Sequence, residues 1–274
     1  MKNILFALTI ITFLSFTSGR VSFFEINSIK KNFVKVKEDL YVSKYEVSNA
    51  DYRSFLADLQ NASQLENYQN CLPDTQCWKD KLQSTAPFVA YYFRHSGYND
   101  YPVVGVRYTA AKKYCSWLTA MYNQNDKRKF KTVNFRLLTK AEWIFAANKG
   151  DTTKVYTWGA GFIQNNRKQD LCNYRSIDYP YDSISKKYQV IEKSASEKLI
   201  ERNKITANVH SYFPNAFGIF NLCGNVAEMV EEQGIAKGGS FNDPAFKVTI
   251  FSETKFQQPQ ADIGFRVAMQ IIEE

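Results

Sequence analysis

The residue whose setting most directly suggests chemistry is Glu228, a carboxylate that follows a turn among small and apolar residues. It belongs to the run Leu222-Cys223-Gly224-Asn225-Val226-Ala227-Glu228-Met229. Gly224 and Asn225 tolerate positive φ, which favours a tight turn. A carboxylate in such a place needs a partner, and a hard cation held together with turn carbonyls is one candidate. An exposed Glu228 at a hairpin corner is the alternative interpretation.

Four further runs accompany this turn along the chain. The first two are Tyr45-Glu46-Val47-Ser48-Asn49, followed by Tyr52 and Phe55, and Phe135-Arg136-Leu137-Leu138-Thr139-Lys140-Ala141-Glu142-Trp143. The last two are Ala236-Lys237-Gly238-Gly239-Ser240-Phe241 and Ile263-Gly264-Phe265-Arg266-Val267. Together with the Glu228 turn, these runs resemble the formylglycine-generating enzyme (sulfatase-modifying factor) family.

That family usually has Glu-Val-Thr-Asn-x-x-Tyr-x-x-Phe, Arg-Leu-Pro-Thr-Glu-Ala-Glu-Trp, Gly-Asn-Val-Trp-Glu-Trp, Arg-Gly-Gly-Ser-Trp and Gly-Phe-Arg at the corresponding places. Here Ala227 and Met229 replace the two tryptophans of the third pattern. The matches extend from about Tyr45 to Val267. The resemblance implies an α+β fold: one formylglycine-generating-enzyme-like domain, related to C-type lectins, with much irregular loop.

The resemblance also indicates where catalysis would take place. Formylglycine-generating enzymes oxidise a cysteine of a sulfatase peptide with a cysteine pair that binds copper(I), a soft metal that prefers thiolates. The corresponding positions, three and eight residues past Ser240, hold Asp243 and Val248, and no cysteine follows Cys223. We therefore expect no copper and no formylglycine formation, which favours a non-catalytic binding or structural module.

A second interpretation is a metal-dependent oxidoreductase of the same family that uses other residues in the same cleft. The polar lining of that cleft would be Ser240, Asn242, Asp243 and Arg266. An iron site with two histidines and a carboxylate would require both His95 and His210. Nothing in the spacing of these two histidines points to a shared site.

Calcium is the cofactor that the resemblance implies for the Glu228 turn. It would be a structural ion held by turn carbonyls and one carboxylate, from Cys223, Gly224, Val226 and Glu228. A second calcium would use Asn173 and the carbonyl of Tyr174. Hard oxygen ligands at a turn suit this cation.

The N-terminal residues have the pattern of an export signal. Lys2 precedes an apolar segment, 4–16, that is too short to span a bilayer. We expect a signal peptide, a lead-in and the family domain over residues 1–19, 20–40 and 41–274. The mature protein would be exported to the periplasm or outside the cell, with no membrane span.

The composition is that of an ordered, basic protein. Of its 274 residues, 45% are hydrophobic and 15% aromatic, and the net charge is +8. Its basic residues are not interleaved with aromatic ones in the manner of nucleic-acid-binding motifs. We expect a protein or glycan ligand in the cell envelope, bound through the irregular stretches 60–100 and 160–205. A cell-envelope, gliding or secretion assembly is the context that the resemblance suggests.

Five cysteines occur, so at least one has no partner within the chain. Cys71 and Cys77 flank a polar loop, and in an exported protein we expect them to form a disulfide. Cys115 lies on the apolar face of a predicted helix and is expected to be a buried thiol. The pairing of Cys172 and Cys223 stays open.

Hydrophobic patterning predicts the elements that position these residues. Residues 41–47 alternate like a strand and are followed by a helix that begins at Ser48 with a pattern similar to a capping box. Residues 101–106 are predicted to form a strand, and Thr109 to cap the helix after it. The run 139–142 forms a full capping box at the start of a third helix.

Overall fold

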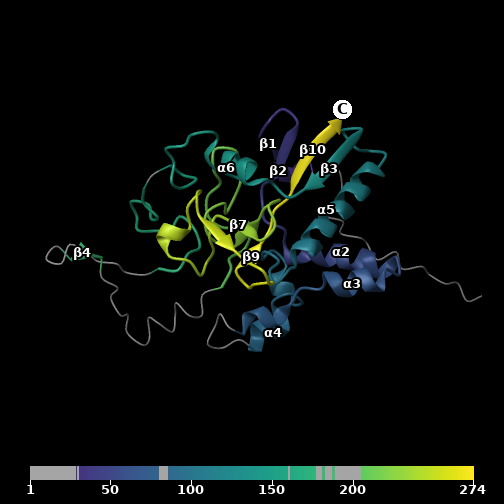
Figure 1. The fold of residues 1–274 in the computed structure, drawn as a ribbon, viewed down its shortest axis with the longest axis horizontal. Coiled ribbons are helices and arrows are strands. Elements are labelled where there is room, and N and C mark those ends of the chain that lie inside the picture. The colour runs from purple at the N-terminus through teal and green to yellow at the C-terminus, as the bar shows by residue number, and fades with distance from the viewer. Residues whose placement is uncertain are drawn as a thin grey trace, which may run out of the picture.

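The computed structural model of the protein describes residues 29, 31–79, 86–159, 161–176, 181–182, 187–188 and 205–274. Short helices and small sheets are joined by long irregular connections (Figure 1). This is the α+β architecture that the sequence predicts. The signal peptide expected at 1–19 lies outside the described residues. In the ranges given above, no helix is long and apolar enough to cross a bilayer.

The first sheet joins the two ends of the described chain. It contains four antiparallel strands in the order β1 (Phe33–Lys35), β2 (Leu40–Ser43), β10 (Ala268–Glu273) and β3 (Thr132–Arg136). Val42 and Arg136 both lie opposite Ala268, so the last strand is inserted between two much earlier ones. The strand predicted at 41–47 ends at Ser43. The carbonyls of Ser43 and Lys44 accept hydrogen bonds from the side chain of Arg266 instead of from a neighbouring strand.

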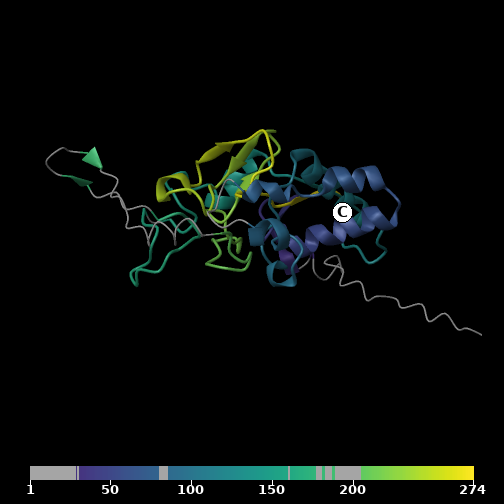
Figure 2. The ribbon, with the colours of Figure 1, turned by 90° about the horizontal axis from the view of Figure 1, so that it is seen from below.

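The second sheet contains the residues that follow the Gly224-Asn225 turn. Its order is β8 (Glu253–Lys255), β7 (Ile235–Lys237), β6 (Ala227–Met229) and β9 (Ile263–Gly264). Strands β6 and β9 run parallel, and the other pairs are antiparallel. Figure 2 shows the yellow strands of this sheet to one side of the blue helices. A separate ladder pairs β4 (Tyr181–Asp182) with β5 (Lys187–Tyr188).

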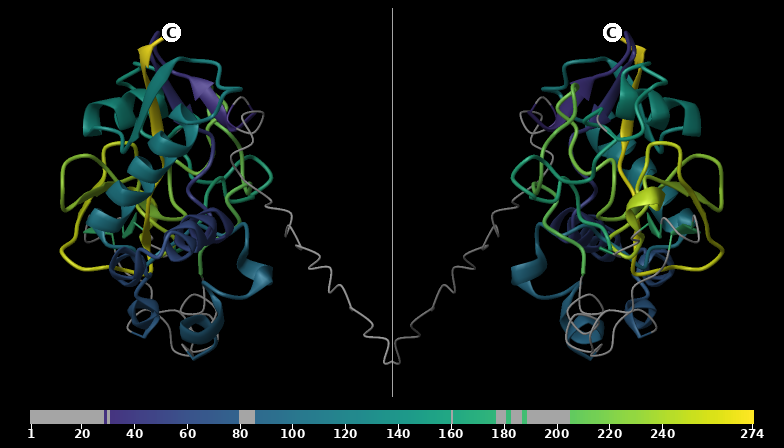
Figure 3. Two further views of the ribbon diagram at one scale, coloured as in Figure 1. Left: turned by 90° about the vertical axis from the view of Figure 1, so that its right-hand side faces the viewer. Right: turned by 90° about the vertical axis from the view of Figure 1, so that its left-hand side faces the viewer.

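One long helix packs against the first sheet, and the other helices lie farther from it (Figure 1). The helices are α2 (Asn49–Asn61), α3 (Leu65–Cys71), α4 (Ala86–Tyr91), α5 (Tyr108–Asn123) and α6 (Lys140–Asn148), with the 3-10 turns η1 (Thr75–Trp78), η2 (Ser96–Tyr98) and η3 (Ala245–Lys247). Helix α5 packs against β3, and α2 packs against α3 (Figures 1 and 3). The buried face of α5 carries Tyr114, whose ring stacks on Tyr52 of α2 at 5.7 Å between centroids. Aromatic packing therefore fixes α2 against α5.

Two helices begin as the sequence predicts. At α2, the Ser48 side chain accepts a hydrogen bond from the Asp51 amide, and Asp51 accepts one from the Ser48 amide. Thr139 and Glu142 form the same reciprocal pair at α6. Glu142 also accepts two hydrogen bonds from the Arg136 guanidinium, at 2.6 and 2.7 Å. Both capping boxes are confirmed, and the second is reinforced by an ion pair.

The stretch 101–106 does not form the predicted strand. Pro102 makes only an isolated bridge to the residue before α2. Gly105 has a φ of +71°, and a Cβ there would lie 2.5 Å from the carbonyl oxygen of Asp74. This glycine bends the chain toward η1 and so interrupts the segment that was predicted to form a strand. The predicted cap at Thr109 is also wrong, because α5 begins at Tyr108 and its N-cap residue is Arg107.

The predicted disulfide between Cys71 and Cys77 is not formed, and the described residues, which include all five cysteines, contain no disulfide. Cys71 is buried in the cluster around Tyr52, whereas Cys77 packs with a separate cluster around Trp78. The two side chains therefore face different parts of the interior. Cys115 is a buried thiol, as expected, and burial raises its pKa to about 12.

Candidate functional site

The Glu228 turn leads to a buried ion pair. Glu228 is 1% exposed and Arg266 is 0% exposed. Oε1 of Glu228 accepts a hydrogen bond from Nη2 of Arg266 at 2.5 Å, and Oε2 accepts one from Nε at 2.6 Å. The indole Nε1 of Trp143 donates to Oε2 at 2.7 Å. Both carboxylate oxygens are thus occupied, in the bidentate geometry that is strongest between these groups.

Arg266 also donates to three backbone carbonyls on two other segments of the chain. Its Nη1 donates to the carbonyls of Ser43 at 3.0 Å and Lys44 at 3.2 Å, and Nη2 donates to the carbonyl of Phe220 at 2.8 Å. The rigid fork of donors allows one side chain to reach all of these acceptors. The prediction that Arg266 lines an open cleft is therefore wrong, because this side chain lies fully inside the protein.

A second buried carboxylate, Glu46, faces the same guanidinium. It is 2% exposed, and its two oxygens accept hydrogen bonds from Nδ2 of Asn225 at 2.7 Å and of Asn221 at 3.2 Å. Burial raises the pKa of Glu46 to about 7; the Arg266 charge opposes this rise and the Glu228 charge adds to it. Burial disfavours the charge of Arg266, but the carboxylates outweigh this and raise its pKa. Two carboxylates thus share one cation.

The predicted calcium site around Glu228 does not fit this geometry. Both oxygens already accept from a guanidinium and an indole, and a divalent cation would face the positive charge of that guanidinium. The predicted carbonyl ligands, Cys223, Gly224 and Val226, belong to a closely packed turn. A Cβ at Gly224 would lie 2.4 Å from the carbonyl oxygen of Asn173. In the described part of the chain, no group of three or more His, Cys, Asp or Glu side chains is placed to hold a metal.

The residues predicted for a second calcium, Asn173 and Tyr174, lie against the same turn. Nδ2 of Asn173 donates to the carbonyl of Ile205 at 2.9 Å and to Oδ1 of Asn225 at 3.3 Å. The Asn173 carbonyl accepts a hydrogen bond from the Asn225 amide at 2.8 Å. Asn173 therefore clamps the Glu228 turn, and the second calcium stays a prediction.

The predicted cleft residues Ser240, Asn242 and Asp243 bind one another. The amide and Oγ of Ser240 donate to Oδ2 of Asp243 at 3.0 and 2.8 Å, and the amide of Asn242 donates to Oγ of Ser240 at 3.2 Å. Val248 is 0% exposed in the apolar cluster around Trp143. The two positions of the family's cysteine pair thus hold a turn-forming carboxylate and a core side chain.

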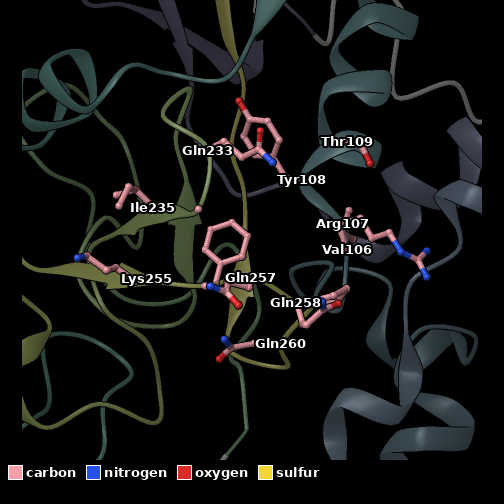
Figure 4. Close-up of a pocket in the computed structure, with 13 residues that line it drawn as sticks. Val106, Arg107, Tyr108, Thr109, Gln233, Ile235, Lys255, Gln257, Gln258 and Gln260 are labelled. Atoms are coloured by element: carbon pink, nitrogen blue, oxygen red, sulfur yellow. The ribbon is translucent and has the colours of Figure 1, made fainter.

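An open groove of about 1160 Å³ lies where the chain after β8 meets the start of α5 (Figure 4). Three segments line it: 106–109, 233–235 and 255–260. Its polar and aromatic side chains are Arg107, Tyr108, Thr109, Gln233, Lys255, Phe256, Gln257, Gln258 and Gln260. The groove therefore offers amide donors and acceptors, two positive charges and two aromatic rings.

The groove was not predicted from the sequence. The stretches predicted to carry specificity, 60–100 and 160–205, contribute no lining residue among their described positions. The Gln-Gln-Pro-Gln run at 257–260 was the available signal, because amides beside a proline are exposed hydrogen-bonding groups on a stiffened segment. The groove wall is held by Tyr108, whose hydroxyl donates to the Glu231 carbonyl at 2.7 Å.

A family model described as "Sulfatase-modifying factor enzyme 1-like domain" matches residues 15–271, so the chain belongs to this family. The formylglycine-generating enzyme of Bos taurus is 20% identical over 211 residues, covering 70% of this chain and 48% of that protein. The formylglycine-generating enzyme of Streptomyces coelicolor is 28% identical over 133 residues, covering 48% of this chain and 32% of that protein. The chain thus spans half or less of the length of these curated relatives.

Solved structures with the same fold are more distant in sequence. Treponema denticola variable protein 1 superposes with a TM-score of 0.51 at 16% identity, covering 84% of each chain. CarF superposes with a TM-score of 0.51 at 20% identity, covering 85% of this chain and 86% of that one. At these identities the likeness shows the fold alone, a single formylglycine-generating-enzyme-like domain.

Proposed function

We propose that the protein is an exported, non-catalytic binding or structural module on the sulfatase-modifying factor scaffold, with a protein or glycan ligand in the cell envelope. The observation that carries this proposal is the groove beside Phe256. Its described lining consists of amides, two cations, aromatic rings and apolar groups, and includes no cysteine, histidine or carboxylate. Such a lining recognises polar, extended molecules by hydrogen bonding and stacking.

The positions of the cysteine pair support a binding role over the family's oxidation chemistry. Copper(I) requires soft thiolate ligands. Val248 offers only an apolar side chain inside the core, and the Asp243 carboxylate accepts the hydrogen bonds of Ser240. Restoring a thiolate pair would therefore require changing both the core packing and the turn.

The proposal is tested by ligand capture with the groove intact and altered. The full chain is immobilised and exposed to a native envelope fraction, beside the double variant Gln257→Ala/Gln258→Ala. Gln60→Ala/Gln124→Ala is the matched control, because these two exposed glutamines lie on α2 and after α5, outside the groove. A glycan or protein retained by the wild type and control, and lost by the groove variant, is the expected result.

Equal retention by all three proteins would contradict the groove as the binding surface. Catalysis is tested separately with a Cys-x-Pro-x-Arg peptide, copper and oxygen. Mass spectrometry should find the thiol unchanged relative to a boiled control. Conversion of the thiol to an aldehyde, or iron or copper bound after purification, would favour an oxidoreductase over the binding module.

A further inference from the structure

A second, smaller cavity lies under the first turn of α2, apart from the groove. It has a volume of about 310 Å³, at the lower end of the range of small-molecule sites, roughly 300–1,000 Å³. Its walls come from the chain before α2, from α2 itself, from the buried face of α5, and from the segment 209–210. Two buried carboxylates, Glu46 and Asp51, line it beside apolar and aromatic side chains.

Asp51 has one carboxylate oxygen available to the cavity. The side chain is 7% exposed, and its Oδ2 accepts hydrogen bonds from the hydroxyl of Ser48 at 2.7 Å and from the Ser48 amide at 3.2 Å. Within the described part of the chain, Oδ1 accepts no hydrogen bond. Burial, the largest cause, raises the pKa of Asp51 to about 7. An acceptor oxygen in such a place gains from a donor that enters the cavity.

Glu46 adds to the negative character of the same cavity. Glu46 and Glu228 share Arg266, so two buried carboxylates are balanced by one guanidinium. Asp100 also lines the cavity and is exposed at its surface. The charge of Arg53 partly stabilises ionised Asp51, but its guanidinium donates to the Phe93 carbonyl and to Oδ1 of Asn99, so it leaves Oδ1 of Asp51 without a hydrogen bond. Above pH 7, where Glu46 and Asp51 are ionised, the excess charge within the cavity is negative, and the binding test below is made at pH 8.

The remaining walls suit the apolar part of a ligand. Phe33, Tyr45 and Tyr114 present ring surface, and Leu118 presents aliphatic surface. The rings of Tyr45 and His210 lie 4.4 Å apart at the edge of the cavity. Aromatic faces attract organic cations. A hard metal ion would require six or more oxygen ligands, which this mainly apolar lining does not provide.

We propose that this cavity binds a small organic ammonium ion, a primary amine on a short aromatic or alkyl group. The ammonium donates to Oδ1 of Asp51, and the apolar group lies against Tyr114 and Leu118. This site is separate from the groove of the proposed function, and neither depends on the other.

The test is calorimetric titration of the full chain with phenethylamine, using phenethyl alcohol as the uncharged probe of matched shape. The amine should bind about tenfold more tightly or better, since a hydrogen bond to a charged group contributes roughly 1.5–3 kcal/mol. Ser54→Leu, which fills the cavity without changing its charge, should abolish binding of both probes. Asp51→Asn should remove the preference for the amine, and Asp126→Asn, on an exposed loop, should leave it unchanged.

Circular dichroism establishes whether each variant is folded. If Asp51→Asn is not folded, Ser54→Leu decides the test. No amine binding by the wild type, equal affinity for the two probes, or unchanged binding by Ser54→Leu would each overturn the proposal. The groove variant Gln257→Ala/Gln258→Ala should bind phenethylamine like the wild type. A loss of binding in that variant would contradict the independence of the two sites.

Discussion

The buried centre around Arg266 and the open groove beside Phe256 differ in how their polar groups are satisfied. In the centre, Nε, Nη1 and Nη2 of Arg266 and both oxygens of Glu228 have partners inside the protein, and these two side chains come from the family's sequence patterns. The groove lies mainly outside those patterns and presents amides to solvent. The residues of the family patterns therefore hold the fold here, and the proposed binding surface is formed by segments between them.

The largest expected effect comes from Arg266→Met. Removing the guanidinium leaves Glu46 and Glu228 buried without a cation, which costs about 3–5 kcal/mol of unfolding free energy. Urea denaturation measures the change. Arg107→Met, in the exposed groove, is the matched control and should stay within about 0.5 kcal/mol of the wild type. Equal losses in the two variants would remove the distinction between the centre and the groove.

The next effect is a pH dependence that arises from Asp51. Its folded pKa of about 7 lies above the ordinary value, so the protonated folded form is favoured. The stability from this group is fully present below the unfolded pKa near 4 and is lost as the pH rises through 7, by on the order of 4 kcal/mol. Unfolding midpoints of the wild type and Asp51→Asn should therefore diverge between pH 5 and pH 8. A difference that does not vary with pH would contradict a titrating Asp51.

A smaller effect is expected when the groove is altered. Gln257→Ala/Gln258→Ala removes exposed side chains that contribute little to packing, so the unfolding free energy should change by about 0.5 kcal/mol or less. Ligand retention should nevertheless be lost. Thermal melts alongside the capture experiment measure both quantities. A large loss of stability would mean that the groove glutamines are structural, like the centre.

The smallest effect concerns calcium. Because Arg266 and Trp143 occupy both oxygens of Glu228, adding calcium or a chelator should leave the melting midpoint unchanged. Elemental analysis of the purified protein provides the second readout. A midpoint that falls on chelation in the wild type but not in Glu228→Gln, with calcium present in the protein, would restore Glu228 as a metal ligand and would require the ion pair to open. A fall in both proteins would instead support the second calcium site at Asn173 and Tyr174.

The sequence was sufficient to predict the fold and the starts of α2 and α6, but not the start of α5. The capping boxes at Ser48 and Thr139 depend on residues three apart, so local rules find them. The partnership of Glu46, Glu228 and Arg266 joins positions that are far apart in the chain, and no local rule connects them. The disulfide prediction failed for the same reason: Cys71 and Cys77 are close in sequence but pack into different clusters.

The place of β10 in the first sheet has a consequence for biosynthesis. The strand that pairs with both β2 and β3 is synthesised after both of them, so Val42 can pair with Ala268 only when a much later part of the chain has been made. Until then, the apolar faces of β2 and β3 lack the neighbour that joins them, so the sheet closes late and through contacts of long sequence separation. Deleting β10 should therefore leave a chain that cannot complete its first sheet.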